Sequence, residues 1–324
     1  MRTTAFNASP HTGEAGIPVS PIEVDSLTKE YPTTKSGVLR AVNNLSFSVR
    51  AGETYALLGP NGAGKSTTIE ILEGHRKPTS GRVSVLGTTP YKAAPSFRAR
   101  IGIVLQEATD AGELRVAESL QALAAYYPRP RAVDELITAV GLDGKDSQRI
   151  STLSGGQRRR LDVAMGLIGN PELLFLDEPT TGFDPDARRA FWELIRGLRA
   201  EGTTIVLTTH YLDEAEQLAD RLGIITDGRL IAEGTPDSLG GPELRRPRVT
   251  WIDDDGAHPG IAREEVTERP AEVVHRLSDG GSREPRNLQV RVPTLEDIYL
   301  ELLKQHKETS AGQRSHDHTA GATS

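Results

Sequence analysis

Residues 59–67, with the sequence GPNGAGKST, constrain the fold more than any other part of the chain. They follow the apolar run at 55–58 and precede a segment with helical character at 68–73. The stretch fits the pattern of a phosphate-binding P-loop between a buried strand and a helix. An ordinary glycine-rich turn is the alternative, but strand, loop and helix stand here in the order that a P-loop needs. We therefore expect a nucleoside triphosphate site in an α/β fold.

The residue types of this loop suit polyphosphate chemistry. Glycines allow a backbone path on which the amides point inward, and the following helix adds the positive end of its dipole. Lys65 can reach the outer phosphates, and the hydroxyl of Ser66 can ligate magnesium. The predicted phosphate-binding residues are Gly59, Pro60, Asn61, Gly62, Ala63, Gly64, Lys65, Ser66 and Thr67.

Composition excludes several classes of function. A net charge of −7 and a sequence pI of about 5.7 give no sign of a nucleic-acid-binding surface, so we expect no nucleic-acid partner. The absence of cysteine excludes disulfides and thiolate metal sites, in agreement with a reducing compartment. The N-terminal region lacks the apolar stretch of a secretory signal, and no apolar run approaches the roughly 18 residues of a membrane span. We therefore expect any membrane role to come through a partner.

Periodicity and composition divide the chain into four parts. Residues 1–20 are rich in Thr, Ser, Pro and Gly and are expected to form a disordered tail. In 21–236, an antiparallel β-region is followed by strands that alternate with helices, which predicts a mostly parallel sheet, and a helical insertion covers about 107–168. Residues 237–306 predict a small α+β unit, and 307–324 are polar and expected to be disordered.

Further motifs follow the P-loop. LSGGQ occupies 153–157 and LLFLDEP occupies 173–179. Gln106 ends a predicted buried strand, and His210 ends the strand TIVLTT at 204–209. In this order and spacing, the chain resembles the ATPase subunit of an ATP-binding cassette (ABC) transporter, most closely the ATPases of bacterial drug- and antibiotic-resistance exporters of the daunorubicin-resistance type.

The resemblance covers about 22–234, and the segment PTLEDIYLELL at 293–303 resembles a C-terminal extension common in that exporter subgroup. It implies an α/β P-loop NTPase cassette with a mostly parallel core sheet, an antiparallel β-subdomain, a helical subdomain and a small C-terminal α+β extension. It also implies ATP and Mg²⁺ as ligands, an ATP-dependent homodimer, a separate transmembrane permease and a peripheral location on the cytoplasmic face of the cell membrane. ATP hydrolysis would drive efflux of a drug-like or lipidic substrate.

Catalytic roles follow partly from position and partly from the resemblance. Asp177 ends a buried strand near the P-loop strand, so its carboxylate can hold magnesium together with Ser66. Glu178, the next residue, is placed to polarise water as a general base. By resemblance, His210 contacts the γ-phosphate, and Gln106 senses magnesium and water. With Lys65, these residues form the predicted catalytic set.

The LSGGQ stretch predicts a second anion site at a helix N-terminus. Because the chain already has a complete phosphate cradle, a second one makes sense if it serves the ATP of another subunit. The resemblance implies this head-to-tail pairing, with Tyr31 stacked on adenine. It also places Asp184, in the stretch TGFDP, at the dimer contact, although Phe183 stands where the family usually has leucine. The signature residues expected to contact nucleotide are Ser154, Gly155, Gly156 and Gln157.

Two other interpretations stay open at this point. A soluble ABC ATPase acting on ribosomes or nucleic acid is disfavoured, because the chain holds a single cassette and has no long coiled-coil insertion before LSGGQ. An importer ATPase with a regulatory C-terminal domain is the other alternative. We also expect the arginines at 158–160 to decorate the helix after LSGGQ, with contact of one of them to a partner as the alternative.

Overall fold

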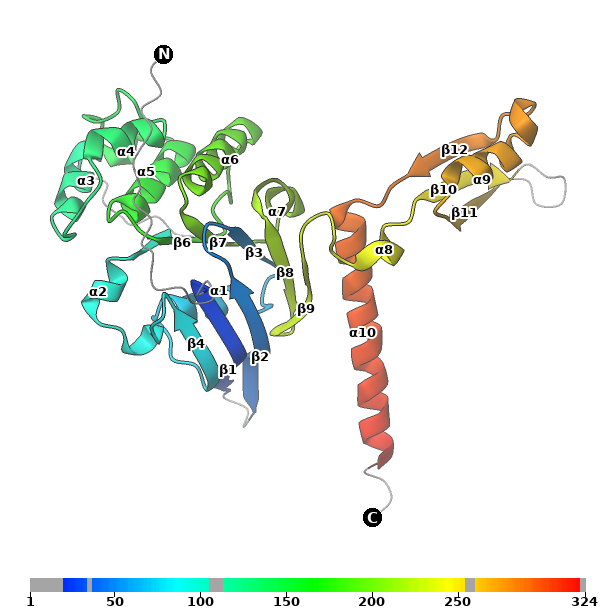
Figure 1. Cartoon of the computed structure of the whole chain (residues 1–324), viewed down its shortest axis with the longest axis horizontal. Helices are drawn as coiled ribbons and strands as arrows, with labels where there is room; N and C mark the ends of the chain where they lie inside the picture. Colours follow the sequence, from blue (N-terminus) through cyan, green and yellow to red (C-terminus); the bar gives the residue numbers. More distant parts are fainter. Residues whose placement is uncertain (1–19, 34–36, 105–112, 254–259, 321–324) are drawn as a thin grey trace, which may run out of the picture.

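The computed structural model describes residues 20–33, 37–104, 113–253 and 260–320 (Figure 1). Its core is a six-stranded sheet in the order β5-β6-β7-β3-β8-β9, in which β5 to β8 run parallel and β9 pairs antiparallel with β8. β3 and β7 are buried along their whole length, and strands of this kind have cover on both faces of the sheet. The strands are β3 (Thr54–Leu58), β5 (Ile101–Val104), β6 (Leu173–Asp177), β7 (Thr204–Thr209), β8 (Arg221–Thr226) and β9 (Arg229–Gly234).

The two faces of this sheet pack against different layers, as the alternation along β3 shows. Tyr55 and Leu57 belong to the core cluster shared with helix α1 (Lys65–Leu72) and the antiparallel sheet. Ala56 and Leu58 belong to the cluster formed with the helices of the opposite face. Those helices include α5 (Gly155–Leu167), α6 (Pro185–Ala200) and α7 (Leu212–Leu218).

The antiparallel sheet has the order β2-β1-β4, formed by β1 (Ile22–Pro32), β2 (Val38–Val49) and β4 (Ser80–Val85). Leu45, Phe47 and Val49 are buried while their neighbours are more exposed, which confirms the predicted half-buried strand. Two short helical segments, η1 (Pro90–Lys92) and α2 (Pro95–Arg98), lead from this sheet to β5.

The helical region contains α3 (Val116–Ala124), α4 (Val133–Ala139), η2 (Ile150–Thr152) and α5, gathered on one side of the core in Figure 1. The predicted α/β cassette with a mostly parallel sheet, an antiparallel sheet and a helical region is thus confirmed. No helix among the described residues has the length and apolar character needed to span a membrane.

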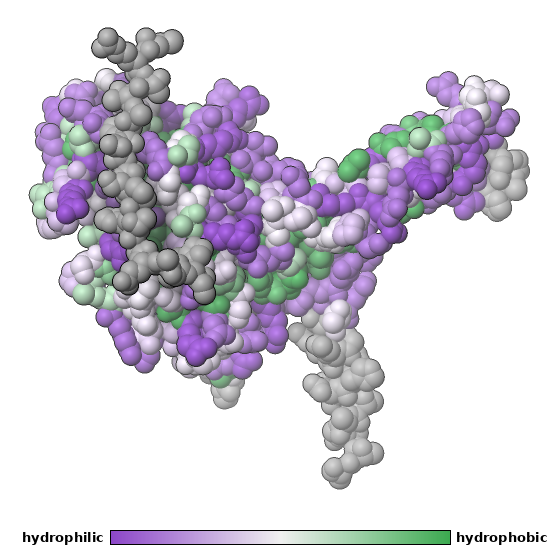
Figure 2. All heavy atoms as spheres, in the orientation of Figure 1, coloured by the Kyte–Doolittle hydropathy of each residue, from purple (hydrophilic) through white to green (hydrophobic). Residues whose placement is uncertain are grey.

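The C-terminal part forms a three-stranded antiparallel sheet in the order β11-β10-β12 that projects from the cassette (Figure 1). Figure 2 shows hydrophobic side chains along this projecting unit. The exposed apolar residues of the unit include Ile261, Val266, Val290 and Val292. Its elements are α8 (Gly241–Leu244), β10 (Arg248–Asp253), β11 (Ile261–Val266), α9 (Pro270–Leu277), η3 (Asp279–Gly281) and β12 (Arg286–Arg291).

The last helix, α10 (Leu295–Ala320), begins at the predicted capping box. Asp297 N donates to Thr294 Oγ1 at 3.3 Å and Thr294 N donates to Asp297 Oδ2 at 2.8 Å. Leu295 and Ile298 pack into the cassette core. The helix continues to Ala320, so the disorder expected from residue 307 is wrong up to that point. The segment contains no proline, and a packed and capped first turn supplies the nucleus from which a polar helix can propagate. The predicted tail at 1–20 lies outside the described residues up to residue 19.

Candidate nucleotide-binding site

The P-loop wraps around the ammonium group of Lys65. Only 5% of this residue is exposed, and its Nζ donates to the carbonyl oxygens of Gly59 at 2.7 Å and Pro60 at 3.3 Å. Gly64 has φ 102°, and a Cβ there would lie 2.2 Å from the Ala41 carbonyl oxygen. The loop therefore needs glycine at 64, as the motif predicts.

Three acidic or basic groups meet the lysine at the carboxyl ends of neighbouring strands. Glu178 follows β6 and His210 follows β7, and these strands are parallel neighbours. Glu178 Oε1 lies 3.6 Å from Lys65 Nζ, and Glu178 Oε2 lies 3.3 Å from His210 Nδ1. Asp177 ends β6 and accepts a hydrogen bond from the Thr208 hydroxyl. The structure thus gathers four of the predicted catalytic and metal residues at one edge of the sheet.

Electrostatics at this edge suit an anionic ligand. Burial lowers the pKa of Lys65, while Glu178 and Asp177 oppose that shift and favour the charged ammonium. A triphosphate would replace the carbonyl oxygens as the partner of the lysine. The hydroxyl of Ser66 and the carboxylate of Asp177 are hard oxygen donors of the type Mg²⁺ prefers, so the donor set fits that ion with phosphates and water completing its shell.

A cavity of about 580 Å³ opens beside the P-loop, and Tyr31 lies at its wall. The tyrosine ring is faced by two cations, with Lys29 Nζ 5.0 Å and Arg76 Cζ 5.7 Å from its centroid. A flat aromatic flanked by cations near a phosphate cradle is able to stack a purine base. The cavity is lined by Tyr31, Leu39, Ala41, Asn61, Gly62, Gly64, Lys65, Ser66, Thr67, Arg76 and Glu178.

The LSGGQ residues do not line this cavity. Ser154 is the N-cap of α5, and it exchanges two hydrogen bonds with Gln157, from Gln157 N to Ser154 Oγ at 3.3 Å and from Ser154 N to Gln157 Oε1 at 3.1 Å. Gly155 and Gly156 form the first turn of the helix. The second predicted anion site is therefore separate from the P-loop within one chain.

Asp184 does not line the cavity, and Gln106 lies outside the residues that the structure describes. Asp184 caps α6, where its Oδ1 accepts from Ala187 N at 2.7 Å, so its carboxylate has a local structural role whatever it contacts in a dimer. The role of Gln106 in sensing magnesium and water therefore stays a prediction.

The backbone of Glu178 is held in an unusual conformation. Its φ is 44°, in the left-handed region that costs a non-glycine residue about 1–3 kcal/mol. On one side, Glu178 N donates to the Thr208 carbonyl oxygen at 3.2 Å and to Thr208 Oγ1 at 3.1 Å. On the other side, Arg159 donates from Nη2 to the Asp177 carbonyl oxygen at 3.0 Å and from Nε to the Pro179 carbonyl oxygen at 2.9 Å. Hydrogen bonds from a charged donor contribute about 1.5–3 kcal/mol each, enough to offset this strain.

Arg159 corrects the expectation that the arginines at 158–160 only decorate α5. Arg159 is 7% exposed. Burial lowers the pKa of its guanidinium, and the carboxylates of Asp162, Asp177 and Glu214 oppose that shift. The sequence contained a signal for the burial of Arg159, because this residue lies four positions before the apolar Val163 and shares its helix face. Thr208 and Arg76 were also missed; a threonine within an aliphatic buried strand was the signal for Thr208.

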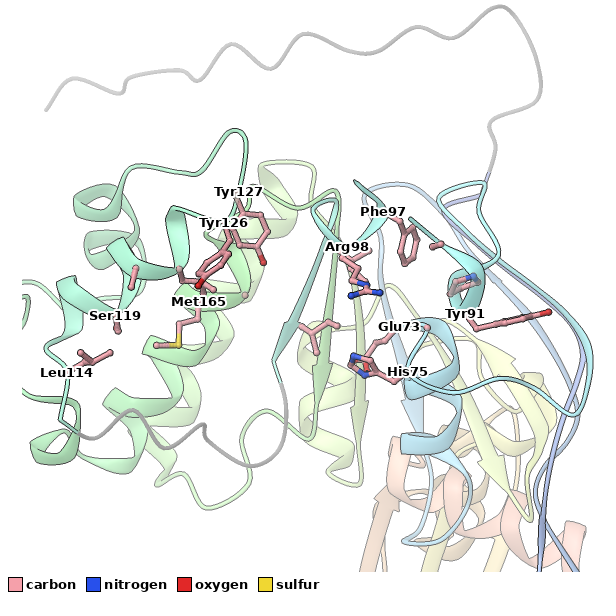
Figure 3. A pocket seen from close by; sticks show the side chains of 18 residues that line it. Glu73, His75, Tyr91, Phe97, Arg98, Leu114, Ser119, Tyr126, Tyr127 and Met165 are labelled. Atoms are coloured by element: carbon pink, nitrogen blue, oxygen red, sulfur yellow. The ribbon is translucent and has the colours of Figure 1, made fainter. Parts of the chain in front are cut away.

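A second cavity, of about 690 Å³, lies between the helical region and the core sheet (Figure 3). In Figure 3, Leu114, Ser119 and Met165 face Arg98 and Glu73 across the opening. Aliphatic and aromatic side chains dominate its wall. The cavity is lined by Glu73, Gly74, His75, Pro90, Tyr91, Ala93, Phe97, Arg98, Ile101, Ile103, Leu114, Ser119, Ala122, Leu123, Tyr126, Tyr127, Met165 and Gly166.

Glu73 is the buried acid of this cleft. Its side chain is 2% exposed, and His75 Nδ1 lies 3.1 Å from its Oε2, yet no donor among the described residues completes a hydrogen bond to that oxygen. Burial raises the pKa of Glu73 to about 8, and the negative charges of Asp177 and Glu70 add to the shift. At neutral pH the carboxyl is therefore mostly protonated.

Comparisons with known proteins agree with this geometry. Residues 42–181 match the family model described as ABC transporter. The Nod factor export ATP-binding protein I of Rhizobium johnstonii is 38% identical over 313 residues, which cover 90% of this chain and 97% of the relative. A dimeric ATP-binding cassette in a post-hydrolysis state, bound to ADP and Pi, has a TM-score of 0.60 and 25% identity over 66% of this chain and 98% of that chain. The ATP-binding subunit of an ABC transporter has a TM-score of 0.63 and 25% identity over 88% of this chain and 100% of that chain.

Proposed function

The chain belongs to the ABC transporter ATPase family, and on that premise we propose that it powers export through a separate membrane permease. The chain is an ATP-hydrolysing subunit of a transport system. The similarity to a Nod factor export protein over almost its whole length carries the proposal of export, since that similarity extends into the C-terminal unit. A drug-like or lipidic compound is the proposed substrate class, and antibiotic resistance is the proposed consequence of its efflux. The proposed location is peripheral, on the cytoplasmic face of the cell membrane.

The ATP site is proposed to be composite and to form only in a homodimer. One wall is the P-loop with Tyr31, and the other is the start of α5 in a second copy. This proposal is supported by the separation of LSGGQ from the P-loop cavity within one chain and by the dimeric state of the similar cassette bound to ADP and Pi. Ser154, Gly155, Gly156 and Gln157 would then contact the partner's nucleotide, and Asp184 would lie at the contact between subunits.

The chemistry assigned to the site is attack of water on the γ-phosphate. Glu178 orients and deprotonates the water, and Lys65 neutralises charge on the transferred phosphoryl group. His210, 3.3 Å from Glu178, fixes the carboxylate and contacts the γ-phosphate. Ser66 and Asp177, with Gln106, would hold Mg²⁺, which supplies charge stabilisation. Positioning and charge are sufficient for this reaction, because phosphoryl transfer needs little covalent help from the protein.

The membrane partner is proposed to dock in the cleft around Glu73. A helical segment with an apolar face and one hydrogen-bond donor complements this surface, since the cleft is largely apolar and contains one buried carboxyl whose Oε2 accepts no hydrogen bond from the described residues. Tyr126 lines the cleft and is 85% exposed, so a substitution there can test whether the partner binds this surface.

The proposal is tested by purifying the tagged chain from detergent-solubilised native membranes. An integral membrane subunit should co-purify, and inverted vesicles that hold the complex should accumulate candidate compounds when ATP is added outside. Tyr126→Asp should reduce co-purification, while Leu300→Asp, which alters another exposed apolar residue, should not. Recovery with ribosomes, with nucleic acid, or with an importer's binding protein would refute the export function.

A further inference from the structure

Arg159 connects two parts of the molecule that are distant in sequence. It lies in α5, five residues after Ser154, and its guanidinium bridges the carbonyl oxygens on either side of Glu178. We propose that Arg159 is a positioning residue, which orients Glu178 for hydrolysis and links that orientation to the start of α5. The second link rests on the proposed composite site, whereas the first rests only on ATP hydrolysis.

The geometry of the guanidinium explains why an arginine occupies this place. Its fork presents two N–H donors in fixed directions, so the bridge fixes the separation of the Asp177 and Pro179 carbonyl oxygens. Those oxygens flank the left-handed backbone of Glu178. Thr208 binds the amide of Glu178 from the opposite side. The carboxylate of Glu178 is thus aimed by a backbone that is held at three points.

The other end of the link is the N-terminus of α5. The helix is one continuous body from Gly155 to Leu167, and most of its inward side chains belong to the larger core cluster. A nucleotide of the partner subunit, bound at Ser154, would therefore contact the same rigid helix that carries Arg159. Arg159 holds the loop of Glu178 in the same chain. Nucleotide binding at one ATP site would therefore change the orientation of the catalytic carboxylate at the other site.

A purely structural role for Arg159 predicts different behaviour. A buried charge that only stabilises the fold would lower thermal stability and activity together. A positioning role lowers the turnover rate while leaving ground-state ATP binding intact, because Tyr31 and the P-loop line the proposed nucleotide cavity and Arg159 does not. A misplacement of about 1 Å in a reacting group can cost on the order of 100-fold in rate.

The experiment compares Arg159→Lys and Arg159→Gln with Arg160→Gln in the full chain. Lysine keeps the charge but cannot span both carbonyl oxygens, and the adjacent Arg160 donates to the Gly141 carbonyl oxygen at 3.4 Å, away from Glu178. We expect kcat to fall about 10- to 100-fold in both Arg159 variants, with KM for ATP changed less than about two-fold. Arg160→Gln should match the parent protein.

A double-mutant cycle with Glu178→Gln completes the test. If Arg159 acts through Glu178, then adding Arg159→Lys to Glu178→Gln should cause no further loss of residual hydrolysis. Additive losses, an unchanged kcat, or a fall in kcat that follows the loss of thermal stability would overturn the proposal. Failure of Glu178→Gln to form an ATP-dependent dimer would instead refute the composite site and the link to α5, and would leave the positioning role to be judged by kcat.

Discussion

Replacing Glu73 with glutamine should remove a pH-dependent loss of stability. Between pH 4.5 and about 8 the unfolded chain ionises this carboxyl while the folded chain retains its proton, so the free energy of unfolding falls as pH rises through that window. At about 1.4 kcal/mol for each pKa unit, raising the pKa from 4.5 to about 8 corresponds to a loss of up to about 5 kcal/mol above pH 8. Glutamine keeps a similar shape but stays neutral at every pH.

Urea unfolding of the parent protein and Glu73→Gln, measured from pH 5 to pH 9, provides the assay. The two proteins should have similar free energies of unfolding at pH 5, and the variant should be several kcal/mol more stable at pH 9. Glu193→Gln is the matched control, because that carboxylate is 74% exposed on α6. If the difference between Glu73→Gln and the parent protein does not change with pH, the assignment of a protonated buried acid is refuted.

Three further predictions concern the nucleotide site. Lys65→Ala should reduce ATP turnover at least about 100-fold, because it removes the cation from the phosphate cradle, and near-normal phosphate release would contradict that role. Tyr31→Ala should weaken ATP binding about 10-fold, the loss expected for one base–aromatic stack, and an unchanged Kd in titration calorimetry would remove Tyr31 from the site. Gly64→Ala should abolish nucleotide binding, since its Cβ would lie 2.2 Å from the Ala41 carbonyl oxygen; retained binding of a fluorescent ATP analogue would show that the loop can adjust.

The core of the fold could be predicted because its signals are local. The run LLFL and the run TIVLTT are fully buried parallel strands, as their short length and their content of aliphatic or β-branched residues indicated. The P-loop motif predicts the backbone path of its loop, and Gly64 has the positive φ that only glycine adopts easily. The place of Asp177, and of Glu178 after it, followed from the rule that parallel strands end at one edge, whereas that of His210 rested on the resemblance to the family.

The features that sequence reasoning missed depend on tertiary contacts. Arg159 stands between two other arginines; its place on the helix face of Val163 could indicate burial, but its contact with the loop of Glu178 depends on tertiary packing. Glu73 reads as an ordinary acid at the end of an amphipathic helix, and its raised pKa arises from the surrounding cleft. The extension of α10 to Ala320 depends on a start that is anchored in the core, which a polar composition does not reveal.

The central claim is that ATP joins two copies of this chain through the P-loop of one and the start of α5 of the other. It is tested most directly by the mass of Glu178→Gln in solution, measured by light scattering after size-exclusion chromatography with Mg²⁺ and ATP. We predict twice the 35.0 kDa of the single chain with ATP and a single-chain mass without it. Adding Ser154→Glu, which places a negative charge against the partner's phosphates, should restore the single-chain mass. A single-chain mass of Glu178→Gln with ATP would contradict the account, and so would a dimer mass that persists after Ser154→Glu is added.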